Sequence, residues 1–227
     1  MFSKIPLRVV MFTAVLALTS AIACRQAQAG SASPFPAPTV DEPQTKAAGQ
    51  ERAVISGGCF WGIQAVFEHV KGVISATSGY TGGAASTAHY EIVSEGNTGH
   101  AESVLVVYDP SKITYGELLK IFFSVAHDPT EVNRQGPDEG TQYRSMISYV
   151  NAEQKKIAEA YIAQLTKAHT FSKPIATQVV SLKAFYPAEA YHQDYAARHP
   201  DDPYIFFNDA PKVAHLKKQF PELYVKK

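Results

Sequence analysis

The chain has few cysteines and no excess of either charge, and both features narrow the range of functions that it can have. Its 227 residues contain two cysteines, and 21 Lys and Arg residues balance 21 Asp and Glu residues. Without net charge the protein has no field that would attract nucleic acid or an anionic surface, so we expect no nucleic-acid partner. Its eight histidines are scattered without the close ligand spacing of a zinc site, and we expect no metal.

A hydrophobic run long enough to span a bilayer is also missing. The apolar stretch at residues 9–23 is shorter than the roughly 20 residues that a stable anchor needs. Lys4 and Arg8 precede this stretch, and the triplet Ala-Gln-Ala at residues 27–29 follows it, which is the pattern of a secretory signal peptide over residues 1–29. We therefore expect an exported protein, periplasmic or secreted, with no membrane span after processing.

A second interpretation of the N-terminus stays open. Residues 21–24 read Ala-Ile-Ala-Cys and imperfectly resemble a lipoprotein box, in which Cys24 would carry the lipid anchor. Under either interpretation Cys24 is removed or blocked, and Cys59 is the only thiol left for chemistry. Residues 30–51 are rich in Ser, Pro and Ala without apolar periodicity, which predicts a flexible linker before a folded domain over residues 52–227.

The periodicities of the folded part predict four strands and two helices in the order β-α-β-β-α-β. The first helix follows Cys59, a capping box of Thr114 and Glu117 opens the second, and the strands cover residues 53–57, 73–78, 101–108 and 146–150. This order is that of the ferredoxin-like split βαβ core, a two-layer α/β sandwich of the α+β class. A helix capped by Asn151 and a strand over residues 176–182 begin a C-terminal extension.

Cys59 lies in the segment Gly-Cys-Phe-Trp-Gly at residues 58–62, between the first strand and the first helix. A thiol at the start of a helix feels the unpaired N–H groups and the positive dipole end of the first turn, which stabilise the thiolate. The flanking glycines let the backbone turn sharply. The residues alone leave two interpretations open, a nucleophile and a small buried hydrophobe, because free cysteines are often buried and inert.

Glu102 is the second unusual residue, because its position in a strand puts a carboxyl group where an apolar side chain is expected. It shares a strand face with Val104 and Val106, since side chains two residues apart point to the same side. A carboxyl group on an inward face would be partly desolvated, its pKa would rise, and it could hold a proton near neutral pH. The alternative is a solvated glutamate at a strand end.

The segment at residues 58–62 resembles the signature of the peptide methionine sulfoxide reductase A family. Further blocks agree with that family in order and spacing, from about residue 53 to the C-terminal helix. These blocks are Gly-Tyr-Thr-Gly-Gly at 79–83, Tyr-Glu at 90–91, Gly-His-Ala-Glu at 99–102, Tyr-Asp-Pro at 108–110, His-Asp-Pro at 127–129, Asn-Arg-Gln-Gly-Pro-Asp at 133–138, Gly-Thr-Gln-Tyr-Arg-Ser at 140–145, Phe-Tyr-Pro-Ala-Glu at 185–189 and Tyr-His-Gln at 191–193.

The resemblance implies an oxidoreductase that reduces the S epimer of methionine sulfoxide, protein-bound or free, to methionine and so repairs oxidised proteins. Cys59 matches the family's nucleophile and Glu102 its acid, and this pairing has a chemical reason. Sulfoxide sulfur is a poor electrophile until its oxygen is protonated, so an acid must act on the oxygen while a thiolate attacks the sulfur. Tyr90 and Tyr143 match phenols that donate to the same oxygen, and Asp138 matches a position in the site's hydrogen-bond network.

The resemblance also implies a binding site for the methionine side chain. The S-methyl group needs an apolar slot with an affinity for sulfur, and the rings of Phe60 and Trp61 are expected to form its walls, next to Gly58. His192 and Glu189 match a C-terminal family segment. We expect them to support the substrate-binding residues, with ordinary structural packing as the alternative.

The sequence departs from many family members at its C-terminus, where residues 220–227 contain no resolving cysteine. Cys59 should therefore end the first half-reaction as a sulfenic acid that no internal disulfide can resolve. We expect recycling by an external thiol, either a thioredoxin-like or glutaredoxin-like protein or a small thiol, with no bound cofactor. We also expect inactivation by excess oxidant, and a monomeric protein.

Three other classes of protein could use parts of the same pattern. A thiol peroxidase would share the low-pKa cysteine and the sulfenic acid, but would not need the aromatic pair or the separate acid. A cysteine hydrolase would need a histidine that activates Cys59, and His192 is the only tempting partner. A methionine-peptide binding module would keep the rings and survive Cys59→Ser unaltered. Peroxide turnover and the Cys59→Ser variant separate these classes.

Overall fold

A six-stranded sheet carries the fold, and its strands lie in the order β7-β6-β1-β3-β2-β8. Adjacent strands are antiparallel except β6 and β7, which are parallel. The central four strands, β6-β1-β3-β2, have the arrangement of the ferredoxin-like split βαβ unit, which confirms the predicted α+β class. The bounds of the six strands are β1 Glu51–Ser56, β2 Val73–Thr81, β3 Ala101–Tyr108, β6 Met146–Tyr149, β7 Gln178–Ser181 and β8 Phe185–Pro187.

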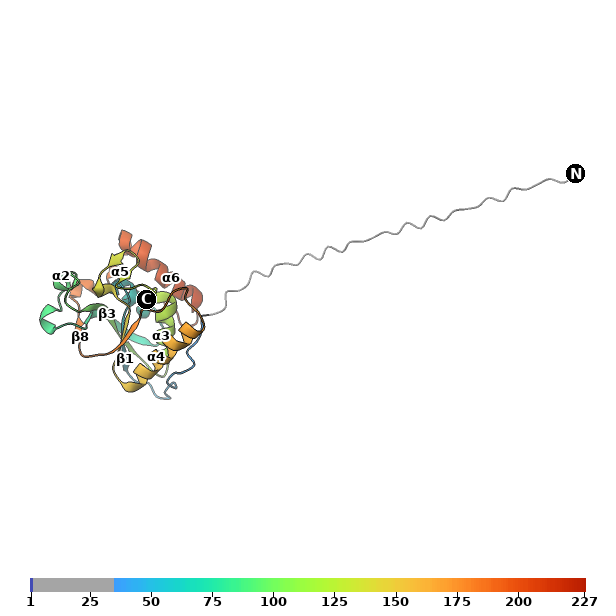
Figure 1. Cartoon of the computed structure of the whole chain (residues 1–227), viewed down its shortest axis with the longest axis horizontal. Helices are drawn as coiled ribbons and strands as arrows, with labels where there is room; N and C mark the ends of the chain where they lie inside the picture. The colour runs from blue at the N-terminus through green and yellow to red at the C-terminus, as the bar shows by residue number, and fades with distance from the viewer. Residues whose placement is uncertain (2–34) are drawn as a thin grey trace. The chain divides into compact units, whose positions relative to one another are not determined.

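The structure is a computed structural model that describes residue 1 and residues 35–227 (Figure 1). The predicted signal peptide over residues 1–29 and the alternative lipid anchor at Cys24 lie outside the described residues. Across the described part of the chain, no helix has the length and apolar character that crossing a membrane requires.

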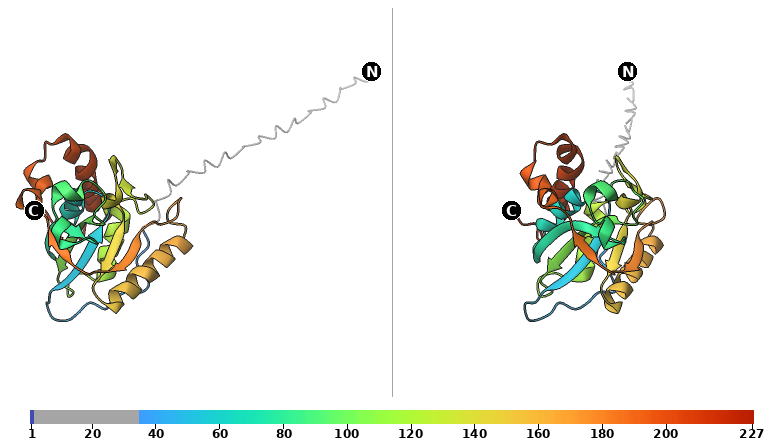
Figure 2. Two further views of the ribbon diagram at one scale, coloured as in Figure 1. Left: turned by 60° about the vertical axis from the view of Figure 1, so that its left-hand side comes forward. Right: turned by 90° about the vertical axis from the view of Figure 1, so that its left-hand side faces the viewer.

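Three helices pack on one face of the sheet and share a core with it. They are α1 (Phe60–Glu68), α3 (Tyr115–Ile121), which continues as the π-helical segment η2 (Phe122–Ala126), and α4 (Ala152–Lys167). The predicted capping box opens α3, since Thr114 accepts from the N–H of Glu117, whose carboxylate accepts from the N–H of Thr114. Figure 2 shows α4 (gold) beside the strands, with the C-terminal helices (dark red) gathered at the other end of the unit.

Short elements fill the connections and the C-terminal extension. A two-stranded ribbon forms within the loop after η2, and the remaining segments are single turns or short helices. Strand β8 was not predicted, because three residues are too few to show a periodicity. The short elements are η1 (Ala85–Thr87), α2 (Tyr90–Val93), β4 (Arg134–Gln135), β5 (Asp138–Glu139), η3 (Thr141–Tyr143), η4 (Ala190–His192), α5 (Tyr195–Arg198), η5 (Ile205–Asp209) and α6 (Ala210–Gln219).

Residues 35–50 differ from the flexible linker that their composition indicates. They form no helix or strand, yet they are held against the domain by hydrogen bonds. The carboxylate of Asp41 accepts from the N–H of Gly116 at 2.8 Å, and Glu42 accepts from the N–H of Tyr115 at 3.0 Å. Both bonds satisfy unpaired donors in the first turn of α3, where negative charge is favourable. A segment without periodicity is therefore ordered by long-range contacts that its composition does not reveal.

Candidate active site

Cys59 is the N-cap residue of helix α1, as the sequence predicts. It follows Gly58, whose φ of +95° lies in the left-handed region that favours glycine. A Cβ atom on Gly58 would lie 2.5 Å from the Cγ atom of Gln135, so the turn before the cysteine has no room for a side chain. The turn therefore fixes the cysteine by backbone geometry and by contact with the loop that carries Gln135.

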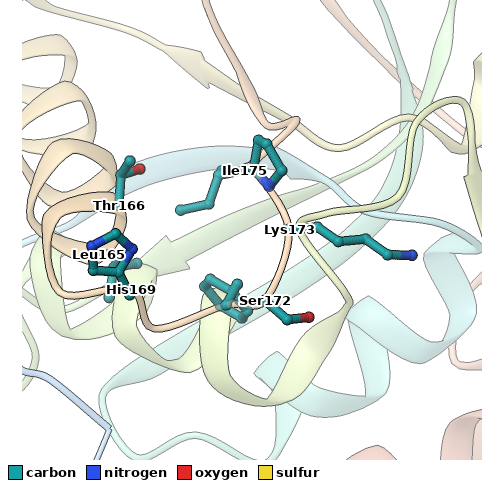
Figure 3. A pocket seen from close by; sticks show the side chains of 8 residues that line it. Leu165, Thr166, His169, Ser172, Lys173 and Ile175 are labelled. Carbon is teal, nitrogen blue, oxygen red and sulfur yellow. The ribbon is translucent and has the colours of Figure 1, made fainter.

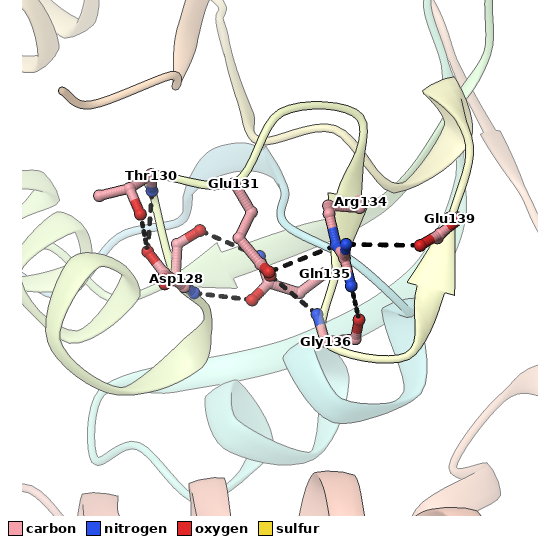
Figure 4. A network of polar contacts seen from close by, with 7 residues as sticks. All are labelled: Asp128, Thr130, Glu131, Arg134, Gln135, Gly136 and Glu139. Atoms are coloured by element: carbon pink, nitrogen blue, oxygen red, sulfur yellow. Dashed lines mark hydrogen bonds and ion pairs between the residues drawn. The ribbon is translucent and has the colours of Figure 1, made fainter. Parts of the chain in front are cut away.

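The loop against this turn is closed by its own side chains (Figure 4). The side chain of Gln135 accepts from the N–H of Asp128 at 2.9 Å and donates to its carbonyl at 3.0 Å. Arg134 forms ion pairs of 3.4 Å with both Glu131 and Glu139. Such exposed ion pairs add little stability, whereas the two hydrogen bonds of the Gln135 side chain to the Asp128 backbone fix this side chain within the loop beside Gly58.

Glu102 is buried on strand β3, with 3% of its surface exposed, on the face that the sequence predicts. Its carboxyl group accepts a hydrogen bond of 3.0 Å from the backbone N–H of Phe60, the residue after Cys59. Burial raises the pKa of Glu102 to about 8, the Phe60 N–H opposes this rise, and the charges of Asp138 and Asp209 add to it. The first turn of α1 thus joins the thiol to a carboxyl group that holds its proton at neutral pH.

The resting state of Cys59 differs from the thiolate that helix position alone predicts. The side chain is 7% exposed, and burial raises the pKa of the Cys59 thiol well above its usual range, with further contributions from Glu102 and Asp209. The backbone N–H of Trp61, although it forms no hydrogen bond to the cysteine in this geometry, favours the thiolate. Desolvation outweighs the effect of the helix N-terminus on the thiol pKa, so the Cys59 thiol is protonated in this state of the site.

Two phenols lie in the electrostatic field of the same pair. Tyr90 opens helix α2 and Tyr143 ends the turn η3, so neither comes from the central sheet. Burial raises the pKa of both phenols, and the negative charge of Glu102 raises it further. Both hydroxyl groups therefore remain protonated and can donate hydrogen bonds.

Glu189 fixes one of these phenols through the backbone. Its carboxylate accepts from the N–H of Tyr90 at 3.0 Å and from the hydroxyl of the fully buried Tyr80 at 2.9 Å. Burial raises the pKa of Glu189, but these hydrogen bonds outweigh burial, and the pKa is lowered overall. The ionised carboxylate of Glu189 thus holds the start of α2 against the sheet, and its supporting role toward substrate-binding residues stays a prediction.

Trp61 is held in an aromatic cluster at the start of α1. Its indole N–H donates to Nδ1 of His192 at 3.1 Å, and its ring stacks on Tyr195 with centroids 3.8 Å apart and planes 11° from parallel. The His192 ring also lies 5.0 Å from the ring of Phe60 and 4.3 Å from that of Tyr90. Phe60 is buried and Trp61 half-buried, so the indole is the ring with surface left for a ligand.

His192 is a neutral acceptor in this cluster. Burial lowers the pKa of its imidazole, against the opposing charge of Glu189. The bond from Trp61 occupies Nδ1 and assigns the proton to Nε2, a buried atom that has no hydrogen-bond partner among the described residues. The geometry favours a role in holding Trp61 over the activation of Cys59 that a hydrolase would need.

Asp138 accepts a short hydrogen bond of 2.5 Å from the hydroxyl of Tyr204, a residue that the sequence analysis missed. The ring of Tyr204 meets that of Trp61 edge-on, with centroids 5.9 Å apart and planes at 83°. Burial raises the pKa of Asp138, while the bond from Tyr204 opposes this rise. Tyr195 and Tyr204 lie in a segment without strong periodicity, and only their position after the Tyr-His-Gln block could have indicated them.

The domain also has cavities that contain none of the predicted site residues. A cavity of about 260 Å³ lies after helix α4 and contains none of the predicted site residues (Figure 3). Its lining consists of Leu165, Thr166, His169, Phe171, Ser172, Lys173, Pro174 and Ile175. Within residues 35–227, no group of three or more His, Cys, Asp or Glu side chains could hold a metal ion.

Comparison with known sequences gives consistent matches. The model of the family described as peptide methionine sulfoxide reductase matches residues 51–224. The peptide methionine sulfoxide reductase MsrA 2 of Mesorhizobium japonicum is 60% identical over 181 residues, which cover 80% of this chain and 93% of that protein. The protein of the same name from Synechocystis is 52% identical over 189 residues, covering 83% of this chain and 88% of that protein.

Comparison with solved structures agrees. Reduced Mxr1 from Saccharomyces cerevisiae has a TM-score of 0.60 and 32% identity, and the match covers 68% of this chain and 91% of Mxr1. Methionine sulfoxide reductase A of Corynebacterium diphtheriae has a TM-score of 0.59 and 34% identity, with 73% of this chain and 86% of that chain covered.

Proposed function

The chain belongs to the peptide methionine sulfoxide reductase family and is an oxidoreductase. We propose that Cys59 and Glu102 together reduce the S epimer of methionine sulfoxide. The substrate is methionine sulfoxide in proteins and peptides, or the free amino acid. The observation that carries the proposal is the buried carboxyl group of Glu102, which is protonated at neutral pH and bonded to the residue after Cys59.

In the proposed step, the Sγ atom of Cys59 attacks the sulfoxide sulfur while Glu102 gives its proton to the sulfoxide oxygen. The sulfur–oxygen bond of the substrate breaks, and a new one forms on Cys59, which becomes a sulfenic acid. The methionine sulfur gains two electrons and the cysteine sulfur loses two. The proton of the thiol passes to the Glu102 carboxylate, so the acid is restored and methionine is released.

The resting protonation states suit this order of events. The thiol and the carboxyl group are both largely neutral at pH 7, because burial raises the pKa of each. A bound sulfoxide brings an oxygen that accepts a hydrogen bond from Glu102, and the carboxylate left after transfer is a base next to the thiol. The substrate thus supplies the change that the buried thiol needs in order to ionise.

We assign Tyr90 and Tyr143 as donors to the same oxygen. Both phenols keep their protons, because burial and the Glu102 charge raise their pKa values. Hydroxyl groups directed at an oxygen that gains negative charge stabilise the transition state more than the ground state. Asp138 acts through Tyr204, which it holds against the edge of Trp61.

We assign the recognition of the substrate's methyl group to the aromatic cluster. The half-buried indole of Trp61 is fixed by a hydrogen bond to His192 and by stacking on Tyr195, so it offers a rigid apolar wall, with Phe60 behind it. Sulfur and its methyl group pack favourably against aromatic rings. A rigid wall on one side and oxygen donors on the other would select one sulfur configuration, and the family resemblance implies that this is the S epimer.

Recycling requires a reductant from outside the chain. Cys59 is the free cysteine of the described residues, and the chain's other cysteine is Cys24. A thiol attacks the sulfenic acid, which releases water and leaves a mixed disulfide, and a second thiol then frees Cys59 and leaves with the first as a disulfide. The donor is a thioredoxin-like or glutaredoxin-like dithiol or a small thiol, and no bound cofactor takes part.

The proposed cellular role is the repair of oxidised proteins outside the cytoplasm, by a protein that acts as a monomer. This role rests on the signal pattern of residues 1–29. Cell fractionation tests this role, and recovery of the active protein in the cytoplasm would contradict it.

Single turnover without reductant tests the chemistry. The protein is mixed with a peptide that carries S-methionine sulfoxide, and methionine and the Cys59 oxidation state are measured by mass spectrometry after trapping with dimedone. We expect one methionine and one trapped sulfenic acid for each Cys59, none with the R epimer, and none with Cys59→Ser. Oxidation of Cys59 by hydrogen peroxide but not by the sulfoxide peptide would instead support the thiol peroxidase.

A further inference from the structure

A buried ion pair lies at the junction of η5 and α6, outside the residues that the family resemblance assigns. The Oδ1 atom of Asp209 lies 3.0 Å from the Nζ atom of Lys212. The Asp209 side chain is fully buried and that of Lys212 is 18% exposed. The second oxygen of Asp209 is also buried and has no hydrogen-bond partner among the described residues.

This ion pair lies against the first turn of the catalytic helix. A Cβ atom on Gly62 would lie 2.1 Å from Oδ1 of Asp209 and 2.7 Å from Nζ of Lys212. Only a glycine allows so close an approach, and Gly62 is three residues after Cys59 on α1. Two opposite charges are thus placed beside the helix turn that carries the thiol and holds Glu102.

Stability gives a poor reason for this arrangement. A buried ion pair loses the hydration of both charges, and replacing it with apolar side chains is often neutral or stabilising. The unpartnered oxygen of Asp209 adds a further cost. The pair therefore calls for a role in the site beside it.

We propose that Asp209 and Lys212 are positioning residues of the reductase reaction, in which the Lys212 ammonium group favours the Cys59 thiolate and Asp209 anchors that ammonium group beside Gly62. This inference deepens the proposed function and rests on it. Neither side chain is assigned a contact with the substrate.

The charges around Cys59 have the signs that the proposed roles of Asp209 and Lys212 require. Glu102 from β3 and Asp209 from η5 raise the pKa of the thiol, and Lys212 from α6 lowers it. Asp209 also raises the pKa of Glu102. The phenols that face the thiol, Tyr90, Tyr143, Tyr195 and Tyr204, have raised pKa values and carry no charge at neutral pH. Asp138 acts on Glu102, whose pKa it raises, and burial raises the pKa of Asp138 itself against the opposing effects of Tyr204 and Lys212.

The test is the pH dependence of Cys59 alkylation, read at the Cys59 peptide by mass spectrometry in the full chain with iodoacetamide. Lys212→Met should raise the midpoint pH of the reaction and slow it about three- to tenfold on the acid side, because the thiolate loses a nearby cation. Asp209→Asn keeps an oxygen that accepts from the Lys212 ammonium group and so leaves that group beside Gly62, but it removes a negative charge, so it should lower the midpoint. Lys212→Arg should restore most of the reactivity, and Lys218→Met, at an exposed position of the same helix, should leave the profile unchanged.

The opposite signs separate this role from a structural one. If the pair only held α6 in place, both substitutions would loosen the same contact and shift the midpoint in the same direction. A common direction, or a Lys212→Met profile that coincides with the wild type, overturns the proposal. Circular dichroism confirms folding, and Lys212→Gln replaces the methionine variant if that protein does not fold.

Alkylation needs no methionine sulfoxide, which keeps the two proposals apart. Failure of the reductase chemistry would appear as no methionine in single turnover, whatever the alkylation profiles show. Failure of the inference would appear as equal or parallel profiles in a protein that still reduces the sulfoxide.

Discussion

The start of helix α1 and the C-terminal segment from residue 185 onward contribute to the same site in different ways. Strands β1 and β3 and helix α1 place Cys59 and Glu102 through backbone geometry, with a hydrogen bond from the Phe60 N–H joining the two. Apart from helix α6, the C-terminal segment contains only short elements, and it reaches the site through side chains, chiefly His192, Tyr204 and the Asp209–Lys212 pair.

The difference assigns different tasks to the two regions. The two groups that take part in the proposed bond changes, Cys59 and Glu102, lie at the start of the helix and on the sheet. The relative positions of these elements are fixed by strand register and by core packing. The C-terminal segment supports them with aromatic stacking, a hydrogen bond to the Trp61 indole and a buried pair of charges. Substitutions in the first region should therefore lower the rate of sulfoxide reduction. Substitutions in the second region should change the KM for the substrate and the pKa of the Cys59 thiol.

The largest expected effect comes from the carboxyl group on the sheet. Glu102→Gln keeps the shape and removes the proton donor, so the single-turnover rate should fall about 10²- to 10⁴-fold. In the wild type the rate should also fall as pH rises through about 8, because the raised pKa of Glu102 means that the proton is lost only there. This alkaline fall should be absent in the variant, and stopped-flow rates between pH 6 and 10 measure both effects.

The stability of this variant provides an independent check on the same carboxyl group. A folded pKa of about 8 against an ordinary value of 4.5 means that the wild type loses stability as pH rises from about 4.5 to about 8. Glu102→Gln should remove this loss and be more stable than the wild type at pH 8 by an amount on the order of a few kcal/mol. Urea unfolding at pH 5 and pH 8 measures the difference, and equal pH dependence in both proteins would contradict the buried acid.

The next effect concerns an oxygen donor between the two regions. Tyr143→Phe should lower the single-turnover rate about 10- to 10³-fold, because one hydroxyl directed at the sulfoxide oxygen is lost. Tyr149→Phe is the matched control on strand β6, where the phenol faces Lys155. A rate for Tyr143→Phe equal to that of the control would exclude the phenol from the reaction.

A smaller effect is expected where the C-terminal segment supports Trp61. His192→Phe keeps an aromatic ring but removes the acceptor for the indole N–H. The KM for the sulfoxide peptide should rise about 3- to 30-fold while kcat changes less, since an orientation is loosened and no reacting group is lost. Steady-state kinetics with dithiothreitol measure the split, with the exposed His215→Phe as the control. A fall in kcat with KM unchanged would place His192 in the chemistry instead.

The smallest effect is expected outside both regions. Asp41→Ala removes the carboxylate that accepts from Gly116 in the first turn of α3, and it should lower the free energy of unfolding by about 0.5–2 kcal/mol with activity unchanged. Urea denaturation measures this, with the exposed Asp201→Ala as the control. No loss of stability would mean that residues 35–50 do behave as the free linker that their composition indicates.

The sequence predicted those parts of the molecule that depend on local pattern. Strand β3 has the predicted bounds, the capping box of Thr114 and Glu117 is present, and the alternation around Glu102 placed its carboxyl group on the buried face. Each of these follows from residues within a few positions of one another. The family blocks indicated the other candidate site residues, several of which contact one another or Trp61 near the start of α1 in the structure.

Features that depend on distant contacts could not be predicted from the sequence. The thiolate expected of Cys59 follows from its helix position, whereas the raised pKa follows from burial by elements far along the chain. Tyr204 and the Asp209–Lys212 pair lie in a segment whose short elements show no periodicity. Tyr204 is placed by its hydrogen bond to Asp138, and the Asp209–Lys212 pair is placed by the packing of α6 against Gly62.

The protonation state of Glu102 tests the central claim most directly. An infrared titration of the protein between pH 5 and 10, taken as the difference between the wild type and Glu102→Gln, isolates the carbonyl band of this one carboxylic acid. With a raised pKa of about 8 for Glu102, the band should be present at pH 7 and disappear with a midpoint near 8. A band that has already disappeared below about pH 5, the range of an ordinary glutamate, would contradict this claim.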